Sequence, residues 1–230
     1  IVMLNGLPVV LMELKSPSRE ETDVSAAYRQ IRNYMKEIPQ MFHYNMFCVM
    51  SDMTESKAGT ITANEDRYMQ WKSTDGHYLS EEVVDYDIFF EGMFEKRRFL
   101  DILRNFICFN KDEGGDNKIL AGYHQYFAVN KAIERTQPAI SGDGRIGVFW
   151  HTQGSGKSYS MVFLAQKVRR KFEGSPTFVI LTDREELNSQ ISDTFENCGL
   201  LGKTKASQFI ATSGDDLVQK LKGNPSFIFT

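Results

Sequence analysis

The residues with the clearest chemistry lie in a glycine-rich turn, HTQGSGKS at 151–158, between an apolar run and an amphipathic segment. Glycines there would let backbone N–H groups turn inward around phosphate oxygens, and a helix starting near Lys157 would point its positive end at the same anion. The Lys157 ammonium could reach the β- and γ-phosphates, while the Ser158 hydroxyl suits Mg²⁺. The turn therefore predicts a P-loop for ATP, with histidine where the GxxxxGK[ST] pattern begins with glycine. The predicted contacts are Gly154, Ser155, Gly156, Lys157 and Ser158.

Gln125 is a second candidate for nucleotide binding, in the helix predicted just before this turn. Its amide offers a donor and an acceptor, which match N6 and N7 of adenine. An exposed helix glutamine is the commoner alternative, so the prediction depends on the neighbouring P-loop. His124 is expected to pack or cap rather than to bind metal.

Thr182 and Arg184 stand where the strand after the P-loop helix should end. Open parallel sheets bind ligands at this edge, so Arg184 and nearby main-chain amides are predicted to contact a nucleic-acid backbone. The alternative is a helix N-cap at Asp183 with a solvated Arg184. A solvated helix face is predicted for the basic residues Lys167, Arg169, Arg170 and Lys171.

A carboxylate and a lysine end an apolar strand near the start of the chain. Alternation places Glu13 and Lys15 on the same face as Val9 and Leu11, at its end. Glu13 could hold Mg²⁺, while Lys15 could position or activate a water for attack on phosphate. Such pairs are common at strand edges, so this pattern alone is weak evidence for a nuclease.

The next predicted helix strengthens the nuclease interpretation. Gln30 and Tyr34 are four residues apart and share a helix face, and both carry a polar tip on the apolar side. The alternative is that Tyr34 belongs to the core and Gln30 lies at its boundary.

These candidates need elements to position them. Asn5-Gly6 between the runs 1–4 and 7–14 predicts a hairpin, followed by a helix from a Thr22-Asp23 cap to Pro39 and a strand at 44–50. A polar loop is predicted at 51–64, a helix at 94–109 and a linker at 110–118. Beyond it, strands at 145–150, 177–182, 207–212 and 226–230 alternate with helices, which predicts βαβ units and a parallel sheet.

Length and composition are those of one large or two compact globular domains. The 230 residues are 41% hydrophobic and 25% charged, with a net charge of −3, so bulk charge does not predict nucleic-acid binding. No apolar run is long enough to span a bilayer. The three cysteines, Cys48, Cys108 and Cys198, stand far apart in the sequence, which predicts buried or free thiols in a reducing compartment rather than a zinc site or disulfide framework.

Five segments together resemble the motor (R) subunit of type I restriction endonucleases: NGLPVVLMELKSP, QIRNY, YHQYFAVNKAIERT, VFWHTQGSGKS and LTDREELNSQ. The resemblance implies an α/β fold, in which a restriction-endonuclease-like PD-(D/E)XK nuclease domain precedes a RecA-like parallel-sheet domain of a superfamily 2 translocase. The expected bounds are 1–92 for the nuclease domain, 93–117 for a helical connector and linker, and 118–230 for the first RecA-like domain.

The resemblance also implies roles for the candidate residues. Glu13 and Lys15 would be nuclease residues and Gln30 with Tyr34 the associated QxxxY motif, with Glu13 on the nuclease Mg²⁺ and Ser158 on the Mg²⁺ of ATP. Gln125 would read adenine. The nuclease Asp would lie at or just before the residue ahead of Ile1, and the acidic Asp-Glu pair of the ATPase would follow Thr230. Because both ends are apolar strands, the sequence is expected to be a piece of a longer protein.

The expected activity of the whole protein is ATP-dependent translocation of duplex DNA coupled to Mg²⁺-dependent endonucleolytic cleavage. The expected partners are duplex DNA and the methyltransferase and specificity subunits, in the cytoplasm of a bacterium or archaeon and without a membrane. Two alternatives remain: a helicase–nuclease of DNA repair, and a nucleotide-binding scaffold with an inactive nuclease fold.

Overall fold

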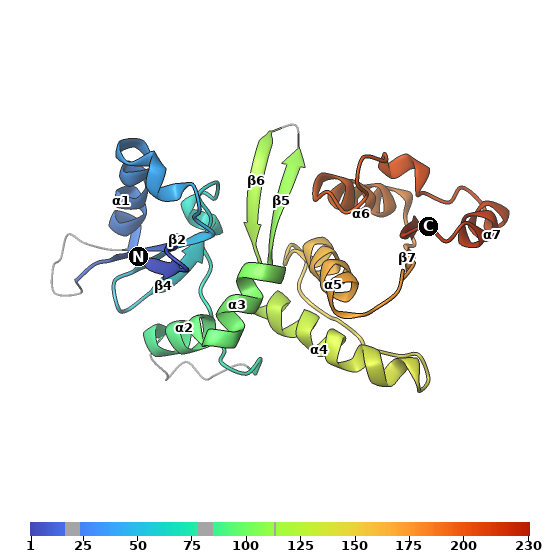
Figure 1. The fold of residues 1–230 in the computed structure, drawn as a ribbon, viewed down its shortest axis with the longest axis horizontal. Helices are drawn as coiled ribbons and strands as arrows, with labels where there is room; N and C mark the ends of the chain where they lie inside the picture. Colours follow the sequence, from blue (N-terminus) through green and yellow to red (C-terminus); the bar gives the residue numbers. More distant parts are fainter. Residues whose placement is uncertain (17–23, 78–84, 113) are drawn as a thin grey trace. The chain divides into compact units, whose positions relative to one another are not determined.

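The computed structural model describes residues 1–16, 24–77, 85–112 and 114–230 and shows a mixed α/β protein (Figure 1). The chain forms two compact units. Unit 1 comprises Ile1–Ile107 and Asn117–Ala128, and unit 2 comprises Cys108–Asp116 and Val129–Thr230. Among the described residues, no helix combines the length and the apolarity that crossing a membrane requires.

A four-stranded mixed sheet is the centre of unit 1. Its strands are β1 (Val2–Leu4), β2 (Leu7–Leu14), β3 (Phe47–Ser51) and β4 (Ser56–Gly59). They lie in the order β1-β2-β3-β4, with β2 and β3 parallel and the outer pairs antiparallel. The predicted hairpin is confirmed, because Asn5 (φ 50°) and Gly6 (φ 83°) both adopt the positive φ that a two-residue turn of type I′ requires. The strand β4 falls in the segment predicted as a polar loop, so that prediction is wrong.

Helix α1 (Val24–Glu37) covers one face of this sheet. Its buried side chains, Val24, Ala27 and Ile31, have the spacing of one helix face and pack in a cluster with Leu11 of β2 and Met50 of β3. The helix ends before Pro39, as predicted, and a 3₁₀ turn, η1 (Pro39–Phe42), follows it. The predicted cap at Thr22 and Asp23 lies outside the described residues.

The opposite face of the sheet packs on helices α2 (Asp85–Phe94) and α3 (Lys96–Asn105). Phe47 of β3 is fully buried, and its ring centroid lies 6.0 Å from that of Phe94 and 6.2 Å from that of Phe99. The sheet is therefore covered on both faces, which fixes the ends of β2 and β3 where Glu13 and Lys15 lie.

The segment predicted as a linker instead forms a hairpin of β5 (Ile107–Asp112) and β6 (Gly115–Leu120). The glycine- and asparagine-rich composition belongs to the tip of this hairpin, where Asp112 Oδ1 accepts a hydrogen bond of 2.9 Å from Gly114 N. Composition alone cannot separate a flexible linker from the turn of a hairpin.

The remaining elements alternate as the sequence predicts, with two exceptions. They are α4 (Tyr123–Ile140), α5 (Lys157–Lys171), β7 (Phe178–Ile180), α6 (Glu185–Asn197), η3 (Ala206–Gln208), α7 (Gly214–Lys222) and β8 (Phe227–Phe229). The strands β7 and β8 pair in parallel, as predicted for βαβ units. The strand predicted at 207–212 is reduced to η3 and a single parallel bridge between Ile210 and Phe229.

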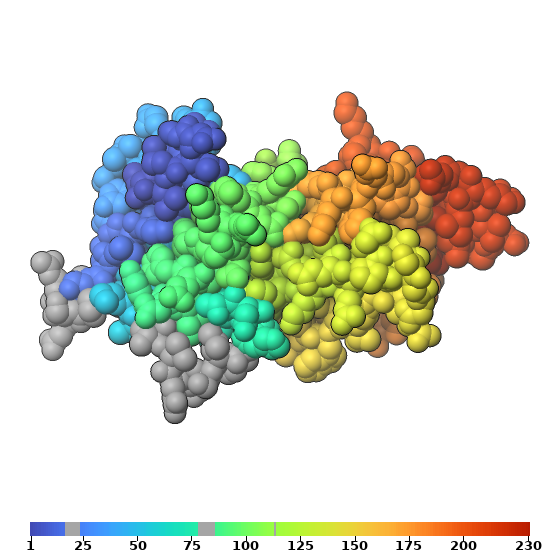
Figure 2. Space-filling view, turned by 60° about the horizontal axis from the view of Figure 1, so that its bottom comes forward, coloured from blue at the N-terminus to red at the C-terminus, as the bar shows by residue number. Residues whose placement is uncertain are grey.

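The strand predicted at 145–150 is the second exception. These residues have no assigned secondary structure, and Val148 and Trp150 are 97% and 81% exposed. The segment around residues 140–150, yellow in Figure 2, lies on the surface. A strand is stabilised by hydrogen bonds to neighbouring strands, and no bridge involves residues 145–150 in the described part of the chain, so the apolar run stays extended and unpaired.

Candidate functional site

The carboxylate of Glu13 ends a buried row of side chains on the α1 side of the sheet. Glu13 is the register partner of Met50, and it lies two residues after Leu11, so all three side chains share one face. Leu11 and Met50 belong to the buried cluster beneath α1, whereas Glu13 is half-buried at its edge. The structure therefore places Glu13 at the end of the apolar face, at the boundary between core and solvent.

Lys15 contacts Glu13 directly. The Lys15 Nζ lies 2.8 Å from Glu13 Oε1, and the two side chains are 20% and 16% exposed. The backbone of Lys15 still follows the sheet, because its N–H donates a hydrogen bond of 2.8 Å to Ser51 O. Partial removal from water strengthens this ion pair relative to an exposed one. The pair can present one carboxylate oxygen and one ammonium group to a phosphodiester.

The predicted QxxxY residues lie on α1, on the same side of the sheet as Glu13. Tyr34 is partly buried and packs against the cluster of Leu11 and Met50, and Gln30 is half-buried one turn earlier. The core alternative for Tyr34 and the motif interpretation are therefore compatible, because one side chain can pack through its ring and still carry a polar tip.

Glu13 can supply one ligand to a magnesium ion. The described residues contain no group of three His, Cys, Asp or Glu side chains arranged to hold a metal. Mg²⁺ in phosphoryl-transfer sites is commonly bound by one or two carboxylates, with waters and substrate phosphate completing the octahedron. Because Lys15 engages Oε1 of Glu13, the second oxygen is the donor that suits this role.

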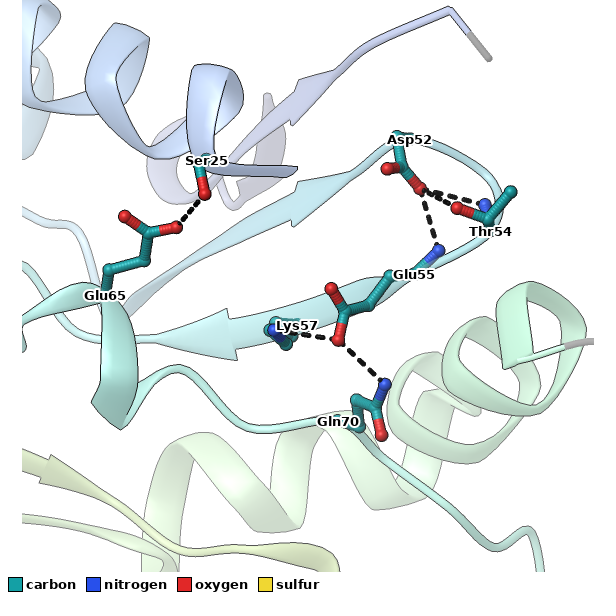
Figure 3. A network of polar contacts seen from close by, with 7 residues as sticks. All are labelled: Ser25, Asp52, Thr54, Glu55, Lys57, Glu65 and Gln70. Atoms are coloured by element: carbon teal, nitrogen blue, oxygen red, sulfur yellow. Dashed lines mark hydrogen bonds and ion pairs between the residues drawn. The ribbon is translucent and has the colours of Figure 1, made fainter. Parts of the chain in front are cut away.

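A polar network that the sequence analysis missed lies at the same end of the sheet, around the turn between β3 and β4 (Figure 3). Asp52 Oδ1 accepts hydrogen bonds from Thr54 N (2.9 Å), Thr54 Oγ1 (2.6 Å) and Glu55 N (2.8 Å). Burial raises the pKa of Asp52, but these hydrogen bonds outweigh it and hold the pKa below its usual value. Asp52 is thus an ionised turn residue.

Lys57 belongs to the same network and to the row of Glu13. It is the register partner of Met50, which is in turn the partner of Glu13. Its Nζ lies 2.7 Å from Glu55 Oε1, and that oxygen also accepts a hydrogen bond of 3.1 Å from Gln70 Nε2. Only the pairing of three strands reveals this second lysine, which is why no local motif identified it.

The glycine-rich turn contains two glycines in the left-handed region. Gly156, at the N-cap of α5, has φ 77° and ψ 33°, and Gly154 has φ 78°. A Cβ at Gly154 would meet no atom within 4 Å, so the positive φ, rather than space, favours glycine there. Two left-handed residues within three positions turn the backbone tightly before the helix begins.

The Lys157 ammonium lies inside this turn. Its Nζ donates hydrogen bonds to the carbonyl oxygens of His151 (3.0 Å) and Thr152 (2.8 Å). The His151 ring lies 4.2 Å from that of Phe149, so the unusual histidine packs on the preceding segment. Ser158 is half-buried in the first turn of α5, beside the positive end of the helix. This arrangement can accept an anion.

Gln125 is not the exposed helix residue of the alternative interpretation. It is only 5% exposed, and its Oε1 accepts a hydrogen bond of 2.9 Å from Gly122 N at the start of α4. The side chain therefore closes the beginning of its own helix. Its predicted contact with adenine stays a prediction.

Arg184 is solvated and Asp183 does not cap α6. The N-cap residue of α6 is Arg184, with no side-chain cap, and Arg184 and Asp183 are 76% and 82% exposed. Thr182 ends the strand segment, with its N–H donating to Thr230 O at 2.7 Å. The cap at Asp183 is thus wrong, whereas the exposure of Arg184 suits a contact with phosphate.

Lys167 is a correction to the predicted solvated face. Arg169, Arg170 and Lys171 are exposed as expected, but Lys167 is 8% exposed and its Nζ donates a hydrogen bond of 2.6 Å to Asn130 Oδ1 on α4. A lysine is buried only where its ammonium group finds a partner. That partner is 37 residues away in the sequence and could not be predicted from local spacing.

Two family models match different parts of the chain. Residues 1–67 match the family described as type I restriction enzyme R protein N terminus, and residues 124–230 match the SWI2/SNF2 ATPase family.

Three relatives carry related names. A type I restriction enzyme HindI endonuclease subunit of Haemophilus influenzae is 40% identical over 204 residues, which cover 86% of this chain and 19% of the relative. A putative type I restriction enzyme MjaIXP endonuclease subunit of Methanocaldococcus jannaschii is 31% identical over 250 residues, covering 99% and 23%. A type I restriction enzyme SauCOLORF180P endonuclease subunit of Staphylococcus aureus is 24% identical, covering 93% and 22%. The chain thus spans about a fifth of the length of these relatives. It belongs to the family of type I restriction enzyme endonuclease (R) subunits.

Proposed function

We propose that the whole protein translocates duplex DNA with ATP and cleaves it with Mg²⁺, as the R subunit of a type I restriction enzyme. The observation that carries this proposal is the presence of two different sites in one chain. A Glu13–Lys15 ion pair of 2.8 Å ends a parallel strand, and a left-handed glycine turn with Lys157 inside it begins a long helix. The first suits phosphodiester hydrolysis and the second suits ATP.

At the nuclease site, this chain supplies one carboxylate and one ammonium group. A bound Mg²⁺ would polarise the phosphate and lower the pKa of a water that attacks it. Glu13 would offer its second oxygen to the ion, while Lys15 would hold the first and orient the phosphate or the water. Gln30 and Tyr34 would support the site from α1.

At the ATP site, Lys157 would exchange partners. Its two carbonyl contacts, with His151 and Thr152, hold the ammonium group where phosphate oxygens would replace them. The left-handed Gly154 and Gly156 let backbone N–H groups turn toward the same anion, and the hydroxyl of Ser158 would serve Mg²⁺. Gln125 would read the adenine edge.

DNA and two further subunits complete the proposal. The exposed Arg184, together with Thr182, would contact the DNA backbone and not its bases, which suits a motor that moves along any sequence. Sequence recognition would belong to a specificity subunit, and a methyltransferase subunit would be its companion. This proposal includes the arrangement of a nuclease domain followed by a RecA-like domain.

The test is a Glu13→Gln variant of the full-length protein, assembled with its methyltransferase and specificity subunits. The amide keeps the shape of the side chain but removes the charge that binds Mg²⁺. We expect cleavage of unmodified plasmid to fall by roughly two to four orders of magnitude, with DNA-stimulated ATP hydrolysis unchanged.

The matched control is Glu55→Gln, which removes another carboxylate at the same end of the sheet, also paired with a lysine. It should cut at the rate of the unmodified protein. Equal cleavage by the Glu13→Gln variant would refute the nuclease assignment and leave a scaffold role. A full-length protein that does not assemble with the two other subunits would instead indicate a repair helicase–nuclease.

A further inference from the structure

Two cysteines that the sequence places far apart meet in unit 2. The Sγ atoms of Cys108 on β5 and Cys198 at the end of α6 lie 3.9 Å apart, although 90 residues separate them in the sequence. Both are free thiols in the structure, and Cys108 is buried while Cys198 is partly exposed. The prediction of free thiols is confirmed, but the sequence did not reveal that two of them meet, because only the tertiary fold brings them together.

The backbone on both sides of the pair is well anchored. Cys198 is the C-cap of α6, where its N–H donates to Thr194 O at 3.0 Å, and the left-handed Gly199 (φ 74°) ends the helix. Cys108 lies in the β5–β6 hairpin, and Asn110, two residues later on the same face, also approaches Cys198, with 4.0 Å between Asn110 Oδ1 and the sulfur. The thiols thus face each other across an ordered contact between two elements.

A disulfide needs a sulfur–sulfur distance of about 2.05 Å, so the two atoms must approach by roughly 2 Å. Rotation about the χ1 angles of the two side chains moves sulfur atoms over such distances while the backbone stays in place. On the β5 side, the polar side chain beside the Cys198 sulfur is Asn110. The site therefore allows the bond without unfolding either element.

We propose that Cys108 and Cys198 form a reversible disulfide when the protein meets a low-molecular-weight disulfide such as glutathione disulfide. The site is a redox modification site, and its product is a covalent link between the β5–β6 hairpin and the end of α6. The loop closed by this bond, residues 108–198, contains the glycine-rich turn and all of α5.

The chemistry assigns different parts to the two thiols. The hydrogen bond between them lowers the pKa of Cys198 and, together with burial, raises the pKa of Cys108. The more exposed Cys198 thus has the greater thiolate fraction, which is the attacking form. The buried Cys108 suits the second, intramolecular step.

The step balances in atoms and electrons. The Cys198 thiolate attacks one sulfur of glutathione disulfide, which forms a mixed disulfide and releases one glutathione thiolate. Cys108 then loses its proton and attacks the Cys198 sulfur, which forms the internal disulfide and releases the second glutathione. The protein loses two electrons and two protons, and glutathione disulfide gains both as two thiols.

The test treats the reduced full-length protein with glutathione disulfide without denaturant, and maps its peptides by mass spectrometry without reduction. We expect a linked peptide pair containing Cys108 and Cys198, lighter by two hydrogens than the sum of its parts and separated again by a reducing agent. Cys48, which is fully buried in unit 1, should stay a free thiol. In urea, glutathione disulfide should no longer favour the pair of Cys108 and Cys198, and disulfides between other cysteines should form as well.

Variants separate the two steps. Cys48→Ser should keep the link, and it is the matched control. Cys108→Ser should stop the reaction at a glutathione adduct on Cys198, whereas Cys198→Ser should leave the buried Cys108 unmodified in the folded protein. The proposal is overturned by any of three results with the folded protein that has no substitutions. These are glutathione adducts alone, disulfides only between two protein molecules, or no change at Cys108 and Cys198.

Discussion

Lys157 is held by two backbone carbonyls of its own turn, and this determines what its removal should do. The ammonium group is exposed and packs against little, so a Lys157→Ala variant should keep its fold. The positive charge opposite the β- and γ-phosphates would be lost, which costs several kcal/mol in a partly desolvated site. We expect ATP hydrolysis and translocation by the full-length protein to fall to background, with an unchanged melting temperature.

The control for this variant is Lys171→Ala, at the other end of α5. It removes an exposed lysine of the same helix, far from the turn, and should translocate DNA at the normal rate. Translocation by Lys157→Ala at that same rate would contradict the P-loop assignment, and a large loss of melting temperature would mean that the lysine is structural.

Residues whose chemistry depends on local spacing could be predicted from the sequence. Glu13 and Lys15 are two positions apart at the end of one strand, and the contact of 2.8 Å between them follows from that spacing. Lys57 and Cys198 could not be predicted, because their roles depend on strand register and on a contact across 90 residues. The missing information in both cases is tertiary.

At the scale of elements, the aromatic packing under the four-stranded sheet makes a test of the fold. Phe47 is fully buried between Phe94 and Phe99, so Phe47→Ala removes a ring from a site with no solvent to refill it. We expect the free energy of unfolding to fall by about 3–5 kcal/mol, measured by urea denaturation with a probe in unit 1.

The comparison is Phe109→Ala on β5, where the ring is 55% exposed. Its effect should stay within about 0.5 kcal/mol, as for other surface substitutions. Similar effects of both substitutions would show that α2 and α3 do not bury Phe47 against the sheet.

The start of α3 predicts a dependence on pH. Glu95 is the N-cap, and its carboxylate accepts hydrogen bonds from Arg98 N (2.9 Å) and Arg97 N (3.1 Å), which lower its pKa from the ordinary value of 4.5. A lowered folded pKa stabilises the protein above pH 4.5, and this contribution is lost as the pH falls through 4.5 and then through the folded value. At pH 7 the Glu95→Gln variant, whose amide resembles the protonated carboxyl group, should melt a few degrees below the protein without the substitution. At low pH the two proteins should have the same melting temperature. A melting difference independent of pH would contradict this origin.

Several elements were predictable because one local signal was enough. Asn5-Gly6 fixed the β1–β2 hairpin, and Pro39 marked the end of α1. The segments that failed needed a partner: 110–118 became a hairpin because β5 and β6 pair, whereas 145–150 stayed unpaired because an apolar run forms a strand only beside another strand. Composition shows that a segment is apolar enough to form a strand, but it does not show whether a partner strand lies beside it.

At the scale of the whole molecule, one chain matches a restriction-enzyme family over residues 1–67 and an ATPase family over residues 124–230. The proposed coupling of cleavage to translocation would have a covalent basis, since both candidate sites belong to one polypeptide. Substitutions should still separate the two proposed activities, because Glu13 and Lys157 belong to different compact units.

The last prediction concerns the polypeptide of residues 1–230 by itself. It should bind ATP, because the turn amides, Lys157 and the positive end of α5 are all present. Hydrolysis also needs an acidic residue at a strand end, a positioned water and usually an arginine from an opposing domain.

In the acidic pair nearest in sequence to β8, Asp216 is engaged elsewhere. Asp215 and Asp216 lie in the first turn of α7, where Asp216 accepts a hydrogen bond of 3.0 Å from Thr212 N and lies 3.6 Å from Lys220 Nζ. None of the three groups that hydrolysis needs is assigned among the described residues, and each carries orders of magnitude in rate, so turnover should be near background and should not respond to DNA. Binding is measured with a fluorescent ATP analogue and hydrolysis by the release of phosphate, each with and without duplex DNA. The Lys157→Ala variant is the control that should lose binding. Strong DNA-stimulated hydrolysis by residues 1–230 would show that this polypeptide already holds every catalytic group, and would require an acidic residue other than Asp215 and Asp216 to act at the turn.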